Sequence, residues 1–431
     1  RHINALFIDA DERLWINTFK GSTYRYDFRS GVLEDLSASV TDNAISRIIQ
    51  SSDGTIWIAA QEGVYRLDRL PYGQFRRSLL HLPGIPADAP QRYRYFLDLC
   101  EDEHGDIWIA TMDGLIRHNP ESGRSITYTI AHGLASNSTY SLLSDSRNGL
   151  IWAGSADNGL SKIRYTEADP GIDVEVLRQD SGSFTLSDNH IWCLRMTKDG
   201  TIWVGTDAGL NRLTVLDGTI TATNHILAPD LENAKIVAIT EDLSGDLWLN
   251  GSQGLFHYKP SSGHVKRYVS DDGLQSNTWT EGAVISKNGW IFVGGINGIN
   301  YFNPNLFSTD PYPGTPFLSE LKIFGQRILP GREYDGHMLL QKPLNNIRQL
   351  ELNYNQNSFT IEFTSDQHAN LSKNSFRYRL DGYDTEWTTV GPERRFAAYT
   401  RLPKGRYTFR LSVSNGDDVW NENERTLTII V

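Results

Sequence analysis

Hydrophobic and polar positions recur along this chain in one frame. In each copy a polar turn is followed by an apolar residue and Trp, and a Gly comes six or seven residues later. Six copies carry the anchor Trp, namely Trp15, Trp57, Trp108, Trp152, Trp203 and Trp248, and a seventh has Phe292 there. Successive anchors lie between 42 and 51 residues apart. This period is typical of four-stranded blades and predicts a seven-bladed β-propeller.

The strands of a blade can be written out around each anchor. Twelve residues before each Trp stands the first apolar residue of an inner strand: Ile3, Ile45, Phe96, Tyr140, Ile191 and Ile236. Turns such as Asp53-Gly54 then lead into the Trp strand, and further strands such as 64–67 and 264–268 complete the unit. Because blades stack face to face, we expect the repeating Trp to pack between blades.

A different pattern begins after Asn303-Pro304. Residues 305–316 include three prolines and predict an extended linker. Short alternating strands follow, at 359–363, 376–380, 407–413 and 426–431. Leu402, Gly405 and Tyr407 have the spacing of a tyrosine corner. We therefore predict an all-β chain with a propeller over 1–304 and an immunoglobulin-like or fibronectin-like β-sandwich over 317–431.

Composition limits the possible functions. The net charge of the 431 residues is −11 without long charged blocks, which argues against a nucleic-acid partner. No apolar run reaches the roughly 20 residues of a membrane span. Cys100 and Cys193 fall on inner strands of non-adjacent copies, so we expect free thiols. No His or Cys cluster has ligand spacing, and we expect neither a metal nor a cofactor.

The chain opens at Arg1, already at the edge of a strand and without an initiating Met. We therefore expect it to be part of a longer protein. The fourth strand of the last copy has no assigned segment, and residues upstream of Arg1 are one source for it. Without that strand the blade would expose an edge.

The repeat resembles the two-component regulator propeller repeat. Its best copy runs from Asn189 through Asp199-Gly200 and Trp203 to Gly209-Leu210. The tail resembles the tyrosine-rich Y_Y_Y sandwich that follows such propellers, through Tyr378, Leu380, Gly382, Tyr383, Asp384, Trp387, Tyr399, Leu402, Gly405, Tyr407, Asn415 and Trp420. Together the two resemblances cover nearly the whole chain.

The resemblance implies the periplasmic sensor region of a hybrid two-component system of Bacteroidetes. Such proteins join two propellers, the sandwich, one membrane helix and cytoplasmic kinase, receiver and DNA-binding modules, and they respond to oligosaccharides released from glycans. This chain would be the second propeller and the sandwich, with the membrane helix just after Val431. The implied partners are an oligosaccharide, the first propeller and a second copy bound through the sandwich. The kinase activity would lie outside this chain.

A ligand site is expected around the mouth of the channel, where the inner strands begin. The residues just before these strands include four unusual choices, namely Tyr95, His190, Lys235 and Trp279. An aromatic face suits the C–H surface of a sugar, and polar side chains suit its hydroxyls. Arg92 and Arg94, in an insertion of the third copy, would pair with a sulfated or uronic sugar.

Simpler interpretations stand beside these. Trp279 would equally serve as a core lid, His190 as a hydrogen-bonded residue at a strand start, and the Arg92–Arg94 segment as a contact to the missing propeller. The turns between second and third strands carry mostly turn formers: Lys20, Glu62, Asp113, Asp157, Asp207, Gln253 and Asn297. Any two of these side chains would still be able to hydrogen-bond a sugar.

Three classes of function remain open on the sequence. A sensor would relay ligand binding through the sandwich. A lyase or glycosidase would need paired carboxylates, or His with a carboxylate, facing the channel. An interaction scaffold would need neither feature. The resemblance favours the sensor.

Overall fold

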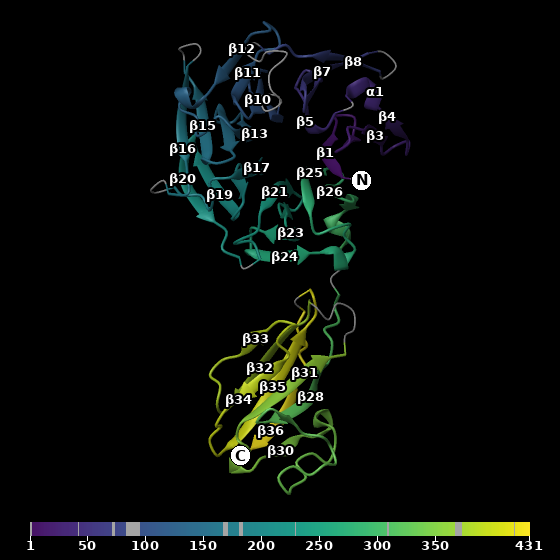
Figure 1. Ribbon diagram of the computed structural model, residues 1–431, viewed down its shortest axis with the longest axis vertical. Coiled ribbons are helices and arrows are strands. Elements are labelled where there is room, and N and C mark those ends of the chain that lie inside the picture. Colours follow the sequence, from purple (N-terminus) through teal and green to yellow (C-terminus); the bar gives the residue numbers. More distant parts are fainter. Residues whose placement is uncertain are drawn as a thin grey trace. The chain divides into compact units, whose positions relative to one another are not determined.

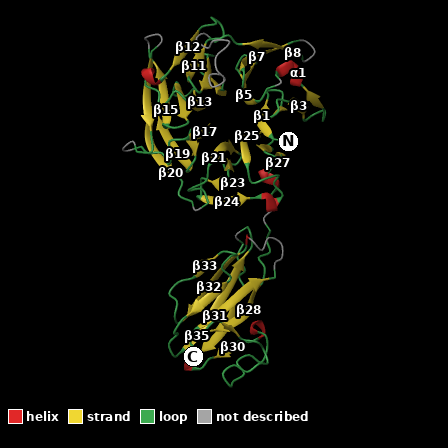
Figure 2. Ribbon diagram, in the orientation of Figure 1, coloured by secondary structure: helices red, strands yellow, loops and turns green. Residues whose placement is uncertain are grey.

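The computed structural model describes residues 2–41, 43–70, 74–82, 95–166, 171–180, 184–228, 230–307, 310–366, 373–417 and 419–431. Its contacts divide the chain into two compact units, Arg1–Leu306 and Phe307–Val431. Strands make up most of both units, and the helical turns between them are short (Figure 2). Within the described residues, no helix has the length and apolar character to cross a bilayer.

The first unit is a ring of seven sheets, and the prediction of an all-β propeller is confirmed. Figure 1 shows the inner strands gathered around the axis of the ring. The inner strands are β1 (Ile3–Ile8), β5 (Ile45–Gln50), β9 (Phe96–Glu101), β13 (Thr139–Asp145), β17 (Ile191–Met196), β21 (Ile236–Glu241) and β25 (Trp279–Ile285).

The second and third strands of each blade pair antiparallel with their neighbours. The second strands, which carry the anchors, are β2 (Arg13–Thr18), β6 (Ile56–Ala60), β10 (Ile107–Thr111), β14 (Leu150–Ser155), β18 (Ile202–Thr206), β22 (Leu247–Gly251) and β26 (Ile291–Gly295). The third strands are β3 (Thr23–Asp27), β7 (Gly63–Arg69), β11 (Gly114–His118), β15 (Leu160–Tyr165), β19 (Gly209–Leu216), β23 (Gly254–Lys259) and β27 (Gly298–Phe302).

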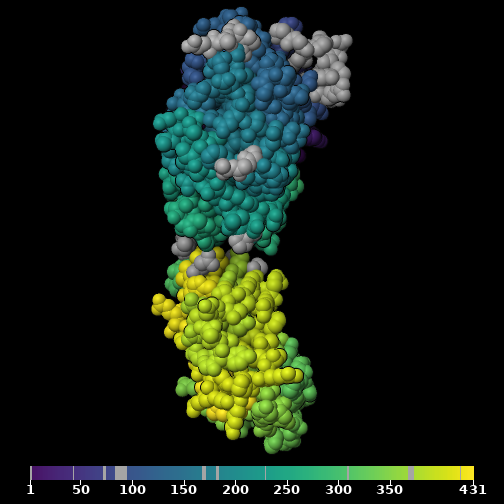
Figure 3. All heavy atoms as spheres, turned by 90° about the vertical axis from the view of Figure 1, so that its left-hand side faces the viewer, coloured from purple at the N-terminus to yellow at the C-terminus, as the bar shows by residue number. Residues whose placement is uncertain are grey.

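Outer strands complete six of the seven blades. They are β4 (Leu33–Asp35), β8 (Phe75–Leu79), β12 (Ser125–Tyr128), β16 (Ile172–Leu177), β20 (Thr219–His225) and β24 (His264–Tyr268). In Figure 3 the edge of the ring that carries β16 and β20 faces the viewer, in blue to teal. Short helices lie between strands: α1 (Ser37–Val40), η3 (Ile130–His132), η4 (Ser270–Asp272) and η5 (Pro304–Leu306).

The seventh blade differs from the others because its sheet has three strands within the described residues. Side-chain packing nevertheless joins it to the first blade, where Ile3, Leu6 and Leu14 form one apolar cluster with Phe292. The Lys287 amide also donates to the Glu12 carboxylate over 3.1 Å. The ring therefore closes through contacts between two sheets.

The anchor Trp side chains are buried and lie in apolar clusters that join adjacent blades, as the sequence predicted. Four of them also donate the indole N–H to a side chain six residues earlier. The pairs are Trp15 to Asp9 (2.9 Å), Trp57 to Ser51 (3.2 Å), Trp108 to Asp102 (2.8 Å) and Trp248 to Asp242 (3.0 Å). Each bond fixes the orientation of a large ring that is otherwise held by apolar contacts.

The same carboxylates also hold the tight turn before the anchor strand. The second oxygen of Asp102 accepts the His104 amide (2.9 Å) and the Asp106 amide (3.0 Å). Asp9 and Asp242 accept turn amides in the same pattern. One carboxylate thus satisfies buried donors of the backbone and of the indole together, which the sequence analysis did not foresee.

The second unit is a sandwich of two sheets. One sheet contains β28 (Pro316–Ile323), β29 (Gln326–Arg327), β31 (Phe359–Ser365) and β34 (Phe396–Tyr399). The other contains β30 (Gln349–Glu351), β32 (Ser375–Asp381), β33 (Thr388–Val390), β35 (Arg406–Ser414) and β36 (Arg425–Ile430). Short helices η6 (Leu344–Asn346) and η7 (Tyr354–Gln356) lie in its loops.

The tyrosine corner of the sandwich has the hydrogen bond that its spacing predicts. The Tyr407 hydroxyl donates to the Pro403 carbonyl over 2.9 Å. Tyr399 donates to Asp384 over 2.9 Å, and the same carboxylate accepts the Leu380 amide. Two tyrosines of the resemblance are therefore structural groups that join loops to strands.

Part of the predicted linker is tied to the sandwich. Asn415 donates to the Asp310 carbonyl over 2.6 Å, and Asn421 donates to the Gly314 carbonyl over 2.8 Å. The division between the two units lies earlier, between Leu306 and Phe307. The residues after Asp310 are thus held by the second unit.

Trp203→Ala tests the packing of the anchors. Trp203 is only 2% exposed and meets Tyr258 of the next blade edge to face at 5.7 Å. Removing the indole leaves a cavity, and we expect the free energy of unfolding to fall by about 3 to 5 kcal/mol. Chemical denaturation measures this change. Leu227→Ala, at a position 73% exposed in the same blade, is the control, and an equal effect of both variants would contradict the assignment.

Candidate functional site

The mouth of the ring, on the side where the inner strands begin, brings together residues of three blades. Because inner and second strands are antiparallel, the turns that follow the second strands lie on this side as well. Two of the predicted site residues, His190 and Lys235, meet here around Trp192. Tyr140 and Asp207 complete the group. We call these five residues the Trp192 cluster.

The Trp192 ring is covered by groups of the protein. His190 stacks on it, with ring centroids 4.2 Å apart, and the Lys235 ammonium lies 3.3 Å from the ring centroid. Tyr140 meets it edge to face at 5.3 Å. A ligand that stacked on this indole would have to displace His190 or Lys235, so the cluster offers its polar edge to solvent more readily than its aromatic face.

Asp207 is the polar centre of the cluster. Its carboxylate accepts the Trp192 indole N–H over 2.8 Å and lies 3.4 Å from His190 Nδ1 and 4.0 Å from Lys235 Nζ. The Asp207 side chain is still 44% exposed. Partial burial lowers the pKa of His190 and of Lys235, although the Asp207 charge opposes both shifts. The site thus presents an exposed carboxylate beside a neutral imidazole and an ammonium group.

Apolar side chains also reach the mouth, in blades away from the Trp192 cluster. The position four residues after the anchor carries Phe19, Met112 and Ile296 in blades 1, 3 and 7, and all three are exposed. The His2 ring stacks on Phe19 at 5.0 Å. The equivalent position in blade 5 is Asp207. The mouth is therefore amphipathic, although every blade repeats the same backbone.

The remaining predicted site residues do not belong to the Trp192 cluster. Tyr95 is exposed at the start of β9, but among the described residues it makes no ring contact or hydrogen bond with the Trp192 cluster. Trp279 is 6% exposed and packs with Trp248 and Ile291, which favours its interpretation as core. Arg92 and Arg94 lie outside the described residues.

The sequence pattern did not single out Trp192 or Tyr140 as site residues. It left Asp207 open, either as a turn former or as a side chain able to hydrogen-bond a sugar. A signal for Trp192 existed, because it lies on an inner strand outside the anchor frame. The importance of Asp207 depends on its contacts with side chains from two other strands, and no local pattern encodes those contacts.

Below the mouth, a cavity of about 370 Å³ runs between the inner strands. Arg47, Asp98, Arg195 and Glu281 line it. Asp98 pairs with Arg47 at 3.0 Å and also accepts the amides of Leu99 and Leu142. Burial raises the pKa of Asp98 in spite of these partners. Asp98 thus links blades 2, 3 and 4.

Glu281 is the second carboxyl of this cavity. Its side chain is exposed to the channel, although many protein atoms of the channel wall surround it. Desolvation by this wall, reinforced by the charge of Asp98, raises the pKa of Glu281 to about 7. The carboxyl is therefore only partly ionised at neutral pH, and small changes in its surroundings alter its charge.

The raised pKa of Glu281 predicts a pH dependence of stability. Between the unfolded pKa of 4.5 and the folded pKa of about 7, the folded protein binds more protons than the unfolded protein does. The contribution of Glu281 to stability is therefore full below pH 4.5 and is lost as the pH rises through 7. Glu281→Gln should flatten the decline of Tm from pH 5 to 8. Differential scanning calorimetry between pH 5 and 8 measures the Tm of both proteins. Glu121→Gln, in an exposed turn, is the control, and an unchanged decline in Glu281→Gln would refute the assignment.

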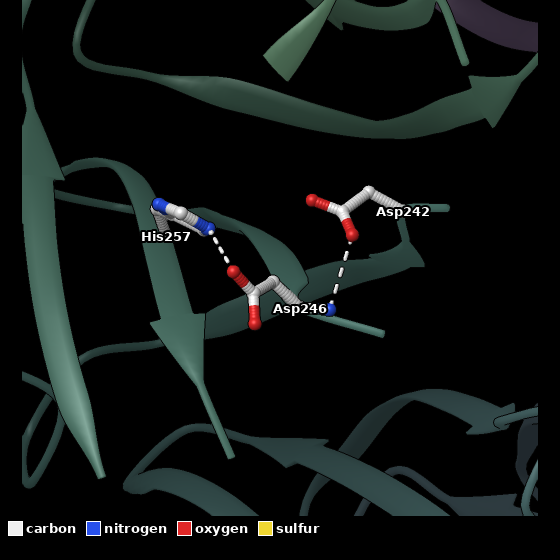
Figure 4. A group of neighbouring side chains, drawn as sticks. All are labelled: Asp242, Asp246 and His257. Atoms are coloured by element: carbon white, nitrogen blue, oxygen red, sulfur yellow. Dashed lines mark hydrogen bonds and ion pairs between the residues drawn. The ribbon is translucent and has the colours of Figure 1, made fainter. Parts of the chain in front are cut away.

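Among the described residues, one group of two aspartates and a histidine has side chains close enough together to hold a metal ion. Asp242, Asp246 and His257 place ligand atoms within 4.8 Å of one another (Figure 4). The spacing of these residues in the sequence does not predict a metal site. The ligand atoms are engaged internally: His257 Nε2 lies 3.0 Å from Asp246, and Asp242 accepts the Asp246 amide and the Trp248 indole.

Comparison with blade 3 favours a structural role for this group. There, Asp102 and Asp106 occupy the places of Asp242 and Asp246, and Arg117 takes the place of His257, with its Nε 2.5 Å from Asp106. A guanidinium is no metal ligand. The histidine therefore substitutes for a basic residue of the repeat, and it stacks on Trp248 at 4.4 Å.

Removing divalent metal should accordingly leave the stability of the propeller unchanged. We expect the same Tm with EDTA and with added Zn²⁺ or Ca²⁺, measured by differential scanning fluorimetry. A rise in Tm with one metal that disappears in Asp246→Asn would show that the group binds it.

The structure is that of a seven-bladed propeller followed by a β-sandwich with a tyrosine corner. Family models agree: the Y_Y_Y domain matches residues 368–431, and the two component regulator propeller matches residues 185–208. Both confirm the resemblance seen in the sequence.

Among curated proteins, the chain is similar to histidine kinase P4 of Formosa agariphila. The two are 24% identical over 444 residues, a match that covers all of this chain and 31% of that protein. The chain thus spans about a third of the length of this relative.

Solved structures share the fold. The extracellular domain of a proposed hybrid two component system from B. thetaiotaomicron matches with a TM-score of 0.76 and 22% identity, over 100% of this chain and 55% of that one. A second such domain from the same organism matches with a TM-score of 0.57 and 19% identity, over 100% of this chain and 57% of that one. Virginiamycin B lyase of Staphylococcus aureus matches with a TM-score of 0.52 and 18% identity, over 70% of this chain and 94% of that one. At these identities the likeness concerns the fold.

Proposed function

We propose that this chain is the extracytoplasmic sensing region of a hybrid histidine kinase and that the mouth of its propeller binds a glycan-derived oligosaccharide. The observation that carries the proposal is the coverage of the matches. A histidine kinase and an extracellular domain of a proposed hybrid two component system both align with the whole chain, propeller and sandwich in the same order. On this proposal the protein lies in the periplasm.

The chemistry of the mouth supports a sugar ligand. A sugar presents hydroxyls at its edge and C–H groups on its faces. The exposed Asp207 carboxylate and Lys235 ammonium suit the hydroxyls. Phe19, which is exposed and stacked on His2, suits the C–H faces.

Signal transfer would follow from ligand binding across several blades. A sugar held between Asp207 of blade 5 and Phe19 of blade 1 would favour one arrangement of the ring and its partners over another. In the proposed parent protein the partners are a first propeller and a second copy bound through the sandwich. The sandwich would pass the change to a membrane helix, and the kinase activity would belong to cytoplasmic modules.

A lyase or glycosidase activity has weaker support. Two carboxyls do face the channel, but Asp98 is held by Arg47 and by two backbone amides. A group that is committed to so many structural bonds is poorly suited to exchange protons with a substrate. The likeness to virginiamycin B lyase concerns the fold and carries no argument for this activity.

Oligosaccharide binding is the direct test. We expect one class in a panel of neutral, uronic and sulfated oligosaccharides to raise the Tm in a dose-dependent manner without being turned over. Asp207→Asn should then weaken binding at least tenfold, about 1.4 kcal/mol, by calorimetric titration. Asp173→Asn, the same charge change on outer strand β16, should bind like the wild type.

Three outcomes would count against the proposal. Turnover of the sugar would favour an enzyme. Binding by Asp207→Asn as tight as that of the wild type would show that the sugar binds away from the Trp192 cluster. Absence of binding by the full parent protein as well as by this chain would favour an interaction scaffold.

A further inference from the structure

Two guanidinium groups reach into the channel from blades that are not neighbours. Arg47 is the third residue of β5 in blade 2, and Arg195 is the fifth residue of β17 in blade 5. Both side chains are exposed to the cavity of about 370 Å³ that the inner strands surround. Because the two blades lie three places apart in the ring, these groups approach each other across the channel.

The charge of Arg47 is compensated within the protein, whereas that of Arg195 is not. Asp98 pairs with Arg47 at 3.0 Å. Among the residues that the structure describes, the Arg195 guanidinium forms no ion pair and donates no hydrogen bond. Glu241 acts on Arg195 through its charge, but its carboxylate accepts the Lys198 amide over 3.0 Å. The channel therefore contains a guanidinium without a partner.

The surroundings of Arg195 are unfavourable for an isolated charge. Although its side chain is exposed to the channel, the atoms of the wall desolvate it. This desolvation, reinforced by the charge of Arg47, lowers the pKa of Arg195. A guanidinium nevertheless stays protonated in proteins. An anion between Arg47 and Arg195 would interact favourably with both.

The carboxyls of the channel leave a positive excess. Asp98 offsets Arg47. Glu281, with its pKa of about 7, carries only part of a negative charge at neutral pH. Arg195 adds a full positive charge, so the channel attracts anions more than cations.

The wall around Arg195 strengthens this attraction. The positions that correspond to Arg195 in the repeat lie eight residues before each anchor. Those that line the cavity are Phe7, Ile49, Thr240 and Val284, and none of them is charged. Apolar walls raise the strength of electrostatic interactions inside a cavity. The cavity has room for roughly a dozen waters, so a small anionic group fits in place of a few of them.

The cavity continues from the mouth of the ring. Trp192 and Tyr140, which belong to the Trp192 cluster, also line it. Arg195 lies three residues further along β17 than Trp192, which is about 10 Å at the rise of a strand. A group that enters from the mouth therefore passes the Trp192 cluster before it meets Arg195.

We propose that the channel between Arg47 and Arg195 binds an oxyanion, namely a carboxylate or sulfate group, with Arg195 as its principal partner. The planar guanidinium pairs with two oxygens of such a group at once. Where the oxyanion belongs to a sugar, the proposal rests on the proposed function, and the ligand at the mouth is an acidic oligosaccharide whose acid group extends into the channel. Free inorganic sulfate offers the same chemistry.

Sulfate titration tests the site. Sodium sulfate replaces sodium chloride at constant ionic strength, and differential scanning fluorimetry measures the Tm of the 431-residue chain. We expect a saturable rise in Tm that Arg195→Gln abolishes. In chloride alone this variant should be as stable as the wild type, because Arg195 has no partner to lose. Arg76→Gln, the same charge change at a side chain 67% exposed on β8, is the matched control and should keep the rise.

Glu281→Gln provides a test of the sign of the charge. This variant removes a partial negative charge near Arg47, so we expect it to bind sulfate at least twofold more tightly. A cation site built from Asp98 and Glu281 predicts no sulfate binding and a loss of cation binding in Glu281→Gln. That result would overturn the proposal.

Glucuronic acid and glucose distinguish the two sources of the oxyanion, because only glucuronic acid carries a carboxylate. By isothermal titration calorimetry, we expect glucuronic acid to bind the wild type at least tenfold more tightly than glucose. Arg195→Gln should remove this difference. Sulfate binding without any preference for glucuronic acid would overturn the assignment to a sugar and identify a site for a free inorganic anion.

The channel site and the proposed function can fail separately. An equal rise of Tm with sulfate in the wild type and in Arg195→Gln would be a general salt effect and would overturn the channel site. An oligosaccharide that binds both proteins equally would also overturn it, while the proposed function would stand. Sulfate binding that depends on Arg195, without binding of any oligosaccharide, would support the channel site and count against the proposed function.

Discussion

The bond between a buried indole and the turn that precedes it underlies the architecture of this ring. In blade 3, Asp102 holds the Trp108 N–H with one oxygen and two turn amides with the other. The bond fixes the turn and the ring together. Because the ring packs against the next blade, the local hydrogen bond also sets the position of a neighbour. Four blades have such a bond, and in each it ties the anchor strand to the turn that follows the inner strand.

The sequence predicted what local repetition encodes. The Trp anchors predicted the blades, and the spacing of Leu402, Gly405 and Tyr407 predicted the corner that the Tyr407 hydroxyl forms. The mouth was harder, because Trp192, Asp207 and Lys235 belong to different strands and meet only in the folded ring. Trp279 was predicted as a site residue but packs in an apolar cluster. From the sequence alone, an aromatic residue at the start of a strand is equally consistent with a ligand contact and with a core residue.

The blades of this propeller differ in side-chain chemistry at positions around the mouth. The residue four places after the anchor is Phe19 in blade 1 and Asp207 in blade 5, while the strands on either side keep the same frame. Phe19 is 61% exposed and the Asp207 side chain is 44% exposed, so both are accessible from the mouth. The repeat thus presents different side-chain chemistry at equivalent exposed positions.

The junction of blades 7 and 1 has a consequence for how the ring is made. Contacts within and between the other blades join residues close in sequence, so they can form progressively as the chain leaves the ribosome. Contact between Ile3 and Phe292 brings together the two extremes of the ring, and it carries the largest loop-closure entropy. The first blade must therefore wait, with one apolar face uncovered, until the last has been synthesised. This waiting period is the time at which the nascent protein is most exposed to aggregation.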